Sequence, residues 1–162
     1  MHRTWRWFAL AAAIVVVDQI TKWAVLGYFA SRFPREEITG FFNLVLVFNK
    51  GAAFSMFADA AGWQTPLLAA FALLASGIVT YLILRNPQKR LLCLGLALIL
   101  GGAIGNLIDR LRFGHVVDFL DFHAMGAHWP AFNVADSGIT VGAVLLILEG
   151  FVNHERRAGA AS

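Results

Sequence analysis

Four long apolar runs alternate with shorter polar segments along this chain of 162 residues. Each run is long enough to cross a bilayer as a helix, which needs about 20 residues at ~1.5 Å of rise per residue. The expected helices cover about residues 7–29, 66–84, 91–112 and 133–152. The pattern therefore predicts a mainly α integral membrane protein, a single domain of four transmembrane helices.

The first run could also be a cleaved signal peptide, because Arg3 and Arg6 precede its apolar stretch. However, the apolar character resumes after Asp18, and no convincing small-residue cleavage site follows. We therefore expect the first run to be a retained transmembrane helix.

The two longer polar segments, about 30–65 and 113–132, have features of β-strands. Residues 41–48 are rich in β-branched and aromatic residues but too few to cross a bilayer, and Asn49 begins a turn. Residues 116–122 alternate with a period near two, which places Asp118 and Asp121 on opposite sides of a strand. We expect a small sheet at the membrane surface on this side, with loop 85–90 and tail 153–162 on the other.

The composition supports a membrane protein, since 59% of the residues are hydrophobic and only 14% are charged. The net charge of +3 comes from small clusters beside the apolar runs, with no basic stripe, so we expect no nucleic-acid partner. The single cysteine, Cys93, lies in an apolar run and excludes an intrachain disulfide. Packing is its expected role.

The charges also predict an orientation. The termini and loop 85–90 carry the basic residues Arg3, Arg6, Arg85, Lys89, Arg90, Arg156 and Arg157 against one acid, Glu155. The other side carries more acids than bases; its bases are Arg32, Arg35, Lys50, Arg110 and Arg112. The positive-inside rule then predicts cytoplasmic termini and an extracytoplasmic position for segments 30–65 and 113–132.

Polar residues recur inside the expected helices. Asp18 and Lys22 share a helix face at i, i+4 spacing, which favours an internal ion pair. In the third helix, Gly101-x-x-x-Gly105 permits close helix approach, and Asn106 and Asp109 follow on nearly the same face. The polar end of the third helix is therefore expected to face protein.

Four carboxylates lie near the same end of the expected bundle, at Asp109, Asp118, Asp121 and Asp136. Ionisable groups near hydrocarbon are costly and tend to be paired or functional. If Asp118 and Asp136 converge, they can share one proton, so that one activates a water while the other acts as an acid. Paired acids can also bind a cation or simply be solvated, so spacing alone leaves the choice open.

Three other interpretations compete with a carboxylate pair. A metal site could use His115, Asp118, Asp121, His123 and His128, but their spacing matches no zinc signature. A Ser/Lys hydrolase could use Ser55 with Lys50 or Lys22, but the chain lacks a G-x-S-x-G motif around that serine. A non-enzymatic channel or packing protein with an acidic vestibule would account for the acids, but not for the Asn106, Asp109 and Arg110 beside them.

Five short segments, in this order and at this spacing, resemble bacterial lipoprotein signal peptidase (signal peptidase II). They are Asp18-Gln-x-Thr-Lys22, Asn49-x-Gly-Ala-Ala-Phe-Ser55, Gly102-x-x-Gly-Asn106-x-x-Asp109-Arg110, Val116-Val-Asp118-Phe and Phe132-Asn133-x-Ala-Asp136. The resemblance covers nearly the whole chain.

The resemblance implies an aspartyl endopeptidase of the bacterial inner membrane, which cleaves diacylglyceryl-modified prolipoproteins N-terminal to the lipidated cysteine. Asp118 and Asp136 would be the catalytic dyad. The supporting and substrate-binding shell would comprise Asn49, Asn106, Asp109, Arg110, Asn133 and Asp18. The resemblance also implies a β-cradle with a short surface helix, and sensitivity to globomycin-type inhibitors. We expect a monomer in contact with membrane lipid, with no metal or other cofactor.

Overall fold

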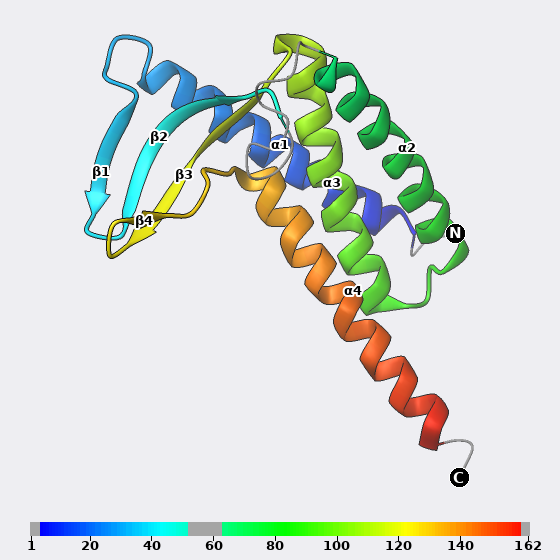
Figure 1. Ribbon diagram of the computed structural model, residues 1–162. Coiled ribbons are helices and arrows are strands. Elements are labelled where there is room, and N and C mark those ends of the chain that lie inside the picture. The colour runs from blue at the N-terminus through cyan, green and yellow to red at the C-terminus, as the bar shows by residue number, and fades with distance from the viewer. Residues whose placement is uncertain (1–3, 52–62, 160–162) are drawn as a thin grey trace.

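The computed structural model describes residues 4–51 and 63–159, with side chains as far as residue 152. Its helices are α1 (Trp5–Tyr28), α2 (Gln64–Arg85), α3 (Arg90–Phe113) and α4 (Val134–Gly159). Its strands are β1 (Arg35–Thr39), β2 (Phe42–Asn49), β3 (Val116–Ala124) and β4 (Ala127–His128). The predicted fold class, four membrane helices with a small sheet, is confirmed. Figure 1 shows the sheet to one side of the helices, beside the end of α1 and the start of α4.

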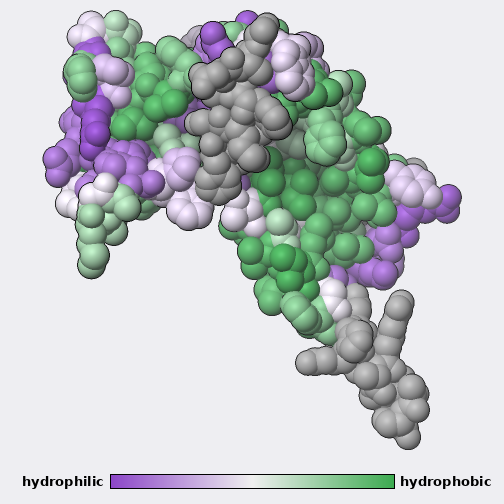
Figure 2. Space-filling model, in the orientation of Figure 1, coloured by the Kyte–Doolittle hydropathy of each residue, from purple (hydrophilic) through white to green (hydrophobic). Residues whose placement is uncertain are grey.

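All four helices are long and apolar enough to cross a membrane, and in α4 the apolar part is Val134–Val152. Many large apolar side chains on their outer faces are exposed, among them Trp23, Phe71 and Ile147. Figure 2 shows hydrophobic residues over the helical part, with hydrophilic residues mostly on the strands and at helix ends. This distribution fits helices that face hydrocarbon on their outer sides.

Helix α3 is the centre of the bundle, because α1, α2 and α4 all pack against it. Its glycines allow the close approach that their spacing predicts. A Cβ on Gly101 would lie 2.7 Å from the carbonyl oxygen of Ala11 in α1, and a Cβ on Gly95 would lie 2.8 Å from that of Gly142 in α4. Small residues on α3 therefore let neighbouring backbones come into direct contact.

The sheet is antiparallel with the order β1-β2-β3-β4, and β2 and β3 correspond to the two predicted strands. Beyond β4 the chain returns along β3, where Phe132 bonds through its backbone to Leu120. Helix α4 begins two residues later at Val134. This return brings the start of α4 beside the middle of β3.

Residues 52–62 lie outside the described part of the chain, and so do Ser55, the nucleophile of the Ser/Lys alternative, and Asp59. The described residues between α1 and α2 form strands and turns, and contain no short surface helix of the kind that the resemblance implied.

Candidate active site

Asp118 on β3 and Asp136 in the first turn of α4 are brought together by Asn133. The Asn133 Nδ2 atom donates to Asp118 Oδ1 at 2.7 Å. Its backbone N–H donates to Asp136 Oδ2 at 3.3 Å, and its side-chain oxygen accepts from the Asp136 backbone N–H at 2.9 Å. Asp118 is buried and Asp136 is half-buried. A single asparagine therefore contacts both carboxylates.

The other two carboxylate oxygens also receive amide donors. Asn49 at the end of β2 donates to Asp118 Oδ2 at 3.0 Å, and Asn106 on α3 donates to Asp136 Oδ1 at 2.7 Å. These donors are neutral, so they orient the carboxylates without cancelling their charge. Two close carboxylates held in this way favour retaining one proton between them.

The surroundings of Asp118 shift its acidity strongly. Burial raises the pKa of Asp118, the negative charge of Asp136 raises it further, and the hydrogen bonds from Asn49 and Asn133 offset only part of this, leaving the pKa at about 7. A pKa raised this far lets Asp118 hold a proton well above the pH at which an ordinary aspartate loses it, which favours a pair that shares one proton.

A buried ion network lies behind this pair. The Lys22 Nζ atom is 2.9 Å from Asp18 Oδ2 and 2.8 Å from Asp109 Oδ2, and it donates to Asn106 Oδ1 at 3.0 Å. The predicted Asp18–Lys22 ion pair is confirmed, and Asp109 is a second partner for the lysine. Because Asn106 also donates to Asp136, one amide links the buried cation to the carboxylate pair.

The two acids of this network also fix the elements that carry the pair. Asp18 on α1 accepts from the backbone N–H of Ala135 at 2.9 Å, in the first turn of α4. A carboxylate is favoured there because unpaired N–H groups and the helix dipole meet at a helix N-terminus. Asp109 accepts from the backbone N–H of Val117 at 3.1 Å, beside Asp118 on β3. The network thus positions both β3 and α4.

Comparison with known proteins identifies the family. A profile of the family described as Signal peptidase (SPase) II matches residues 10–152. The chain belongs to the signal peptidase II family. The lipoprotein signal peptidase of Paraburkholderia phytofirmans is 53% identical over 88% of this chain and 83% of the relative. That of Ralstonia nicotianae is also 53% identical, over 91% of this chain and 85% of the relative.

Two solved structures, each described as a bacterial membrane enzyme determined by the in meso method, share the fold. The one at 2.3 Å resolution has a TM-score of 0.80 and 26% identity, and the match covers 93% of this chain and 90% of that one. The one at 1.9 Å resolution has a TM-score of 0.74, also at 26% identity. Both share the fold of this chain along most of its length, 93% and 89% of it respectively.

Arg110 of this signal peptidase II chain reaches away from Asp109, its neighbour in sequence. Its guanidinium donates to the carbonyl oxygen of Gly51 at 3.2 Å and to that of Asn106 at 3.5 Å. Asn49 accepts from the Gly51 backbone N–H at 2.9 Å, so it is a turn residue as well as a partner of Asp118. Arg110 and Asn49 together hold the chain where it leaves β2, next to the carboxylate pair.

Asp121 occupies a separate site, as the alternation along β3 predicts. It accepts from Asn43 at 2.7 Å and lies 2.9 Å from His128 Nδ1. Burial opposes its ionisation, but the hydrogen bonds from Asn43 and His128 outweigh that effect, and the pKa of Asp121 is lowered. In this signal peptidase II chain, Asp118 and Asp121 therefore differ in partners and in acidity.

The residues of the metal-site alternative do not form one group. Asp121, His123 and His128 lie together, with the two histidine rings 4.9 Å apart, but His115 and Asp118 have other partners. His115 packs against the rings of Phe48 and Phe113, while Asp121 faces His128 and Asp118 faces amides. Within residues 4–51 and 63–152, no three His, Cys, Asp or Glu side chains are grouped so as to hold a metal ion.

Sequence reasoning missed Gln19. Its Nε2 atom donates to Asp109 Oδ1 at 2.9 Å and to the carbonyl oxygen of Gly105 at 3.3 Å, so it joins α1 to the polar end of α3. The sequence feature that could have indicated a role for Gln19 is its position between Asp18 and Lys22, in the first of the five family-like segments.

Proposed function

We propose that this chain is a membrane aspartyl endopeptidase that removes the signal peptide from diacylglyceryl-modified prolipoproteins, N-terminal to the lipidated cysteine, with Asp118 and Asp136 as its catalytic dyad. The observation that carries this proposal is the contact of Asn133 with both carboxylates, combined with the pKa of Asp118 at about 7. Membership in the signal peptidase II family and relatives named lipoprotein signal peptidase support the substrate class.

The dyad would work with one shared proton. Asp136 lies in the first turn of α4, where the helix dipole favours a negative charge, so it suits the role of base. It would take a proton from a water whose oxygen attacks the scissile carbonyl carbon, while Asp118 donates its proton to the carbonyl oxygen. Collapse of the tetrahedral intermediate then breaks the C–N bond. The leaving nitrogen takes the proton that Asp136 holds, and Asp118 takes back a proton from a hydroxyl of the intermediate, so the dyad again holds one proton.

The surrounding polar residues would position the dyad rather than react. Asn133, Asn49 and Asn106 each donate to a dyad carboxylate. The remaining supporting residues are Asp18, Asp109 and Arg110, which hold the elements around it. Arg110 and Asn49, both in contact with Gly51, are also suitably placed to meet a substrate backbone.

We propose that the protein crosses the bacterial inner membrane four times, with both termini in the cytoplasm and the dyad near the extracytoplasmic face. The excess of basic residues at the termini and in the loop before α3 supports this orientation. A dyad at the sheet-bearing end of the helices can meet a cysteine whose acyl chains stay in the bilayer. Each buried methylene contributes roughly 0.8 kcal/mol to holding the scissile bond at that depth.

The implied partners are the prolipoprotein and membrane lipid, with the enzyme itself a monomer. Globomycin-type inhibitors would act at the dyad. We infer weak sequence selectivity beyond small residues before the cysteine, because the acyl chains, more than the side chains, would hold the scissile bond at the dyad. The expected substrate groove along Gly102 and Gly105 is not found, since both glycines are packed against Ala135 of α4.

Cleavage of matched substrates tests this function. The purified protein is given a diacylglyceryl-modified prolipoprotein and its unmodified counterpart in the same detergent micelles. We expect a much higher kcat/KM for the modified substrate. Equal kcat/KM for the two would show that lipid is not recognised and would favour a general signal peptidase.

A further inference from the structure

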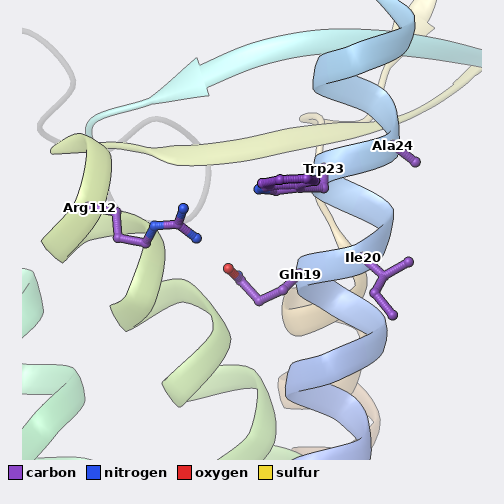
Figure 3. Close-up of a pocket in the computed structure, with 5 residues that line it drawn as sticks. All are labelled: Gln19, Ile20, Trp23, Ala24 and Arg112. Atoms are coloured by element: carbon purple, nitrogen blue, oxygen red, sulfur yellow. The ribbon is translucent and has the colours of Figure 1, made fainter.

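A groove of about 490 Å³ lies between α1 and α3, outside the site described above. It is lined by Gln19, Ile20, Trp23, Ala24 and Arg112. Figure 3 shows Trp23 and Gln19 pointing from α1 towards the guanidinium of Arg112 on α3. Apart from Gln19 and Arg112 the residues that line the groove are apolar. The guanidinium of Arg112 is therefore a positive charge at the edge of a mostly hydrophobic groove.

Among the described residues, no acid forms an ion pair with Arg112. Arg112 is exposed, and its guanidinium lies 5.0 Å from the centre of the Phe113 ring. Asp109, the acid nearest to Arg112 in sequence, and Asp18, which precedes Gln19 on α1, both face Lys22. An anion from outside the protein is the complementary ligand for such a guanidinium.

The groove continues into an apolar surface that suits a hydrocarbon chain. Val16, Ile20 and Trp23 recur at helical spacing on α1, and their exposed fractions are 54%, 63% and 68%. Trp23 lies five residues before the end of α1, about 7 Å along the helix axis. Tryptophan at this depth is typical of the membrane interface, and Val16 lies about two turns deeper.

We propose that this groove binds a membrane phospholipid, with its phosphate on Arg112 and one acyl chain along Val16, Ile20 and Trp23. The guanidinium distinguishes a phospholipid from the diacylglyceryl group of a prolipoprotein, which has the same chains but no phosphate. Because Gln19 both lines the groove and donates to Asp109, the lipid would contact the back of the network that supports the dyad. The proposal rests on the fold and not on the proposed catalytic function.

Native mass spectrometry of the full chain tests this proposal. The protein is titrated in detergent with a dipalmitoyl phosphatidylglycerol and, separately, with dipalmitoylglycerol. We expect the phospholipid to bind more tightly, and Arg112→Gln to weaken its binding roughly tenfold, as expected for loss of a charge-assisted contact. Trp23→Ala, which keeps the charge but removes an apolar wall of the groove beside Arg112, should weaken it as well.

Arg85→Gln is the matched control. Like Arg112, Arg85 lies in the last turn of a helix and stacks on an aromatic ring, that of Tyr81, but it lies outside the groove. It should leave the affinity unchanged, and melting temperatures report whether each variant is folded. Equal binding by wild-type protein and Arg112→Gln would overturn the proposal. Equal affinity for dipalmitoylglycerol and for the phospholipid would also overturn it, and would assign the groove to the lipid of the substrate. An equal loss of phospholipid affinity in Arg85→Gln and Arg112→Gln would overturn it too, because it would indicate attraction to any surface arginine.

Discussion

Asp118 and Asp121 show how surroundings can separate two chemically identical residues three positions apart. Asp118 faces neutral amides and another carboxylate, and its pKa is raised to about 7. Asp121 faces Asn43 and His128, and its pKa is lowered. Pairs of acids whose pKa values are driven apart in this way commonly take different roles. The contrast makes Asp118 the candidate acid and Asp121 a structural residue.

The raised pKa predicts the alkaline limit of activity. The competent dyad holds one proton, and Asp118 loses its proton as the pH rises through about 7. We therefore expect kcat/KM to fall above about pH 7, by up to tenfold per pH unit. The measurement is kcat/KM against pH in one detergent, with melting temperature followed in parallel. A constant kcat/KM up to pH 9 with an intact fold would contradict a proton held on Asp118.

Removing the buried cation should damage both stability and activity. Lys22→Met leaves Asp18 and Asp109 buried without their common counter-ion, and loss of one partner of a buried pair costs about 3–5 kcal/mol. We expect a lower melting temperature in detergent, and slower cleavage because Asn106 loses a donor. Lys50→Met, which changes an exposed lysine, is the control. Equal melting temperatures for the two variants would show that the network is not needed.

Part of this residue-level detail was predictable. The i, i+4 spacing gave the Asp18–Lys22 pair, and alternation along β3 separated Asp118 from Asp121. The second partner of Lys22 was not predictable, because Asp109 lies on another helix and their contact depends on how α1 and α3 are aligned. The same holds for the contact of Asn133 with Asp118, which arises only when Phe132 pairs back onto β3.

At the level of elements, hydropathy predicted all four helices and both strands of the central pair, but not every boundary. The apolar pattern ends near residue 152, whereas α4 continues to Gly159. Hydropathy marks the part of a helix that contacts lipid, and a helix can continue into water on polar residues. The sequence analysis missed β1 because it is an exposed, charged edge strand without an apolar alternation. It missed β4 because this strand has only two residues.

The packing of α3 against α4 gives a prediction at this level. A Cβ on Gly102 would overlap the carbonyl oxygen of Ala135 and lie 2.7 Å from Ile139, next to Asp136. Gly102→Ala should therefore push α4 outward and lower both melting temperature and kcat, as overpacking typically costs about 1–3 kcal/mol. Gly77→Ala on α2 is the control, since a Cβ there meets nothing within 4 Å. Normal kcat in Gly102→Ala would indicate that α4 can shift without disturbing Asp136.

At the scale of the whole molecule, the position of the dyad depends on which way the bundle is inserted. The proposed orientation puts the termini in the cytoplasm and the sheet outside. A C-terminal alkaline phosphatase fusion should then be inactive, and a fusion after residue 40, between β1 and β2, should be active. An active C-terminal fusion would reverse the topology and place the dyad at the cytoplasmic face.

The most direct test of the account is cleavage of a diacylglyceryl-modified prolipoprotein by four purified forms of the protein. These are the wild type, Asp118→Asn, Asp136→Asn and Asp121→Asn. An amide keeps the shape of the carboxyl group but cannot exchange its proton, so the first two variants should lose about a thousandfold or more in kcat with melting temperatures near wild type. Asp121→Asn should keep most of the activity. Wild-type cleavage by Asp118→Asn or Asp136→Asn, or loss confined to Asp121→Asn, would contradict the dyad.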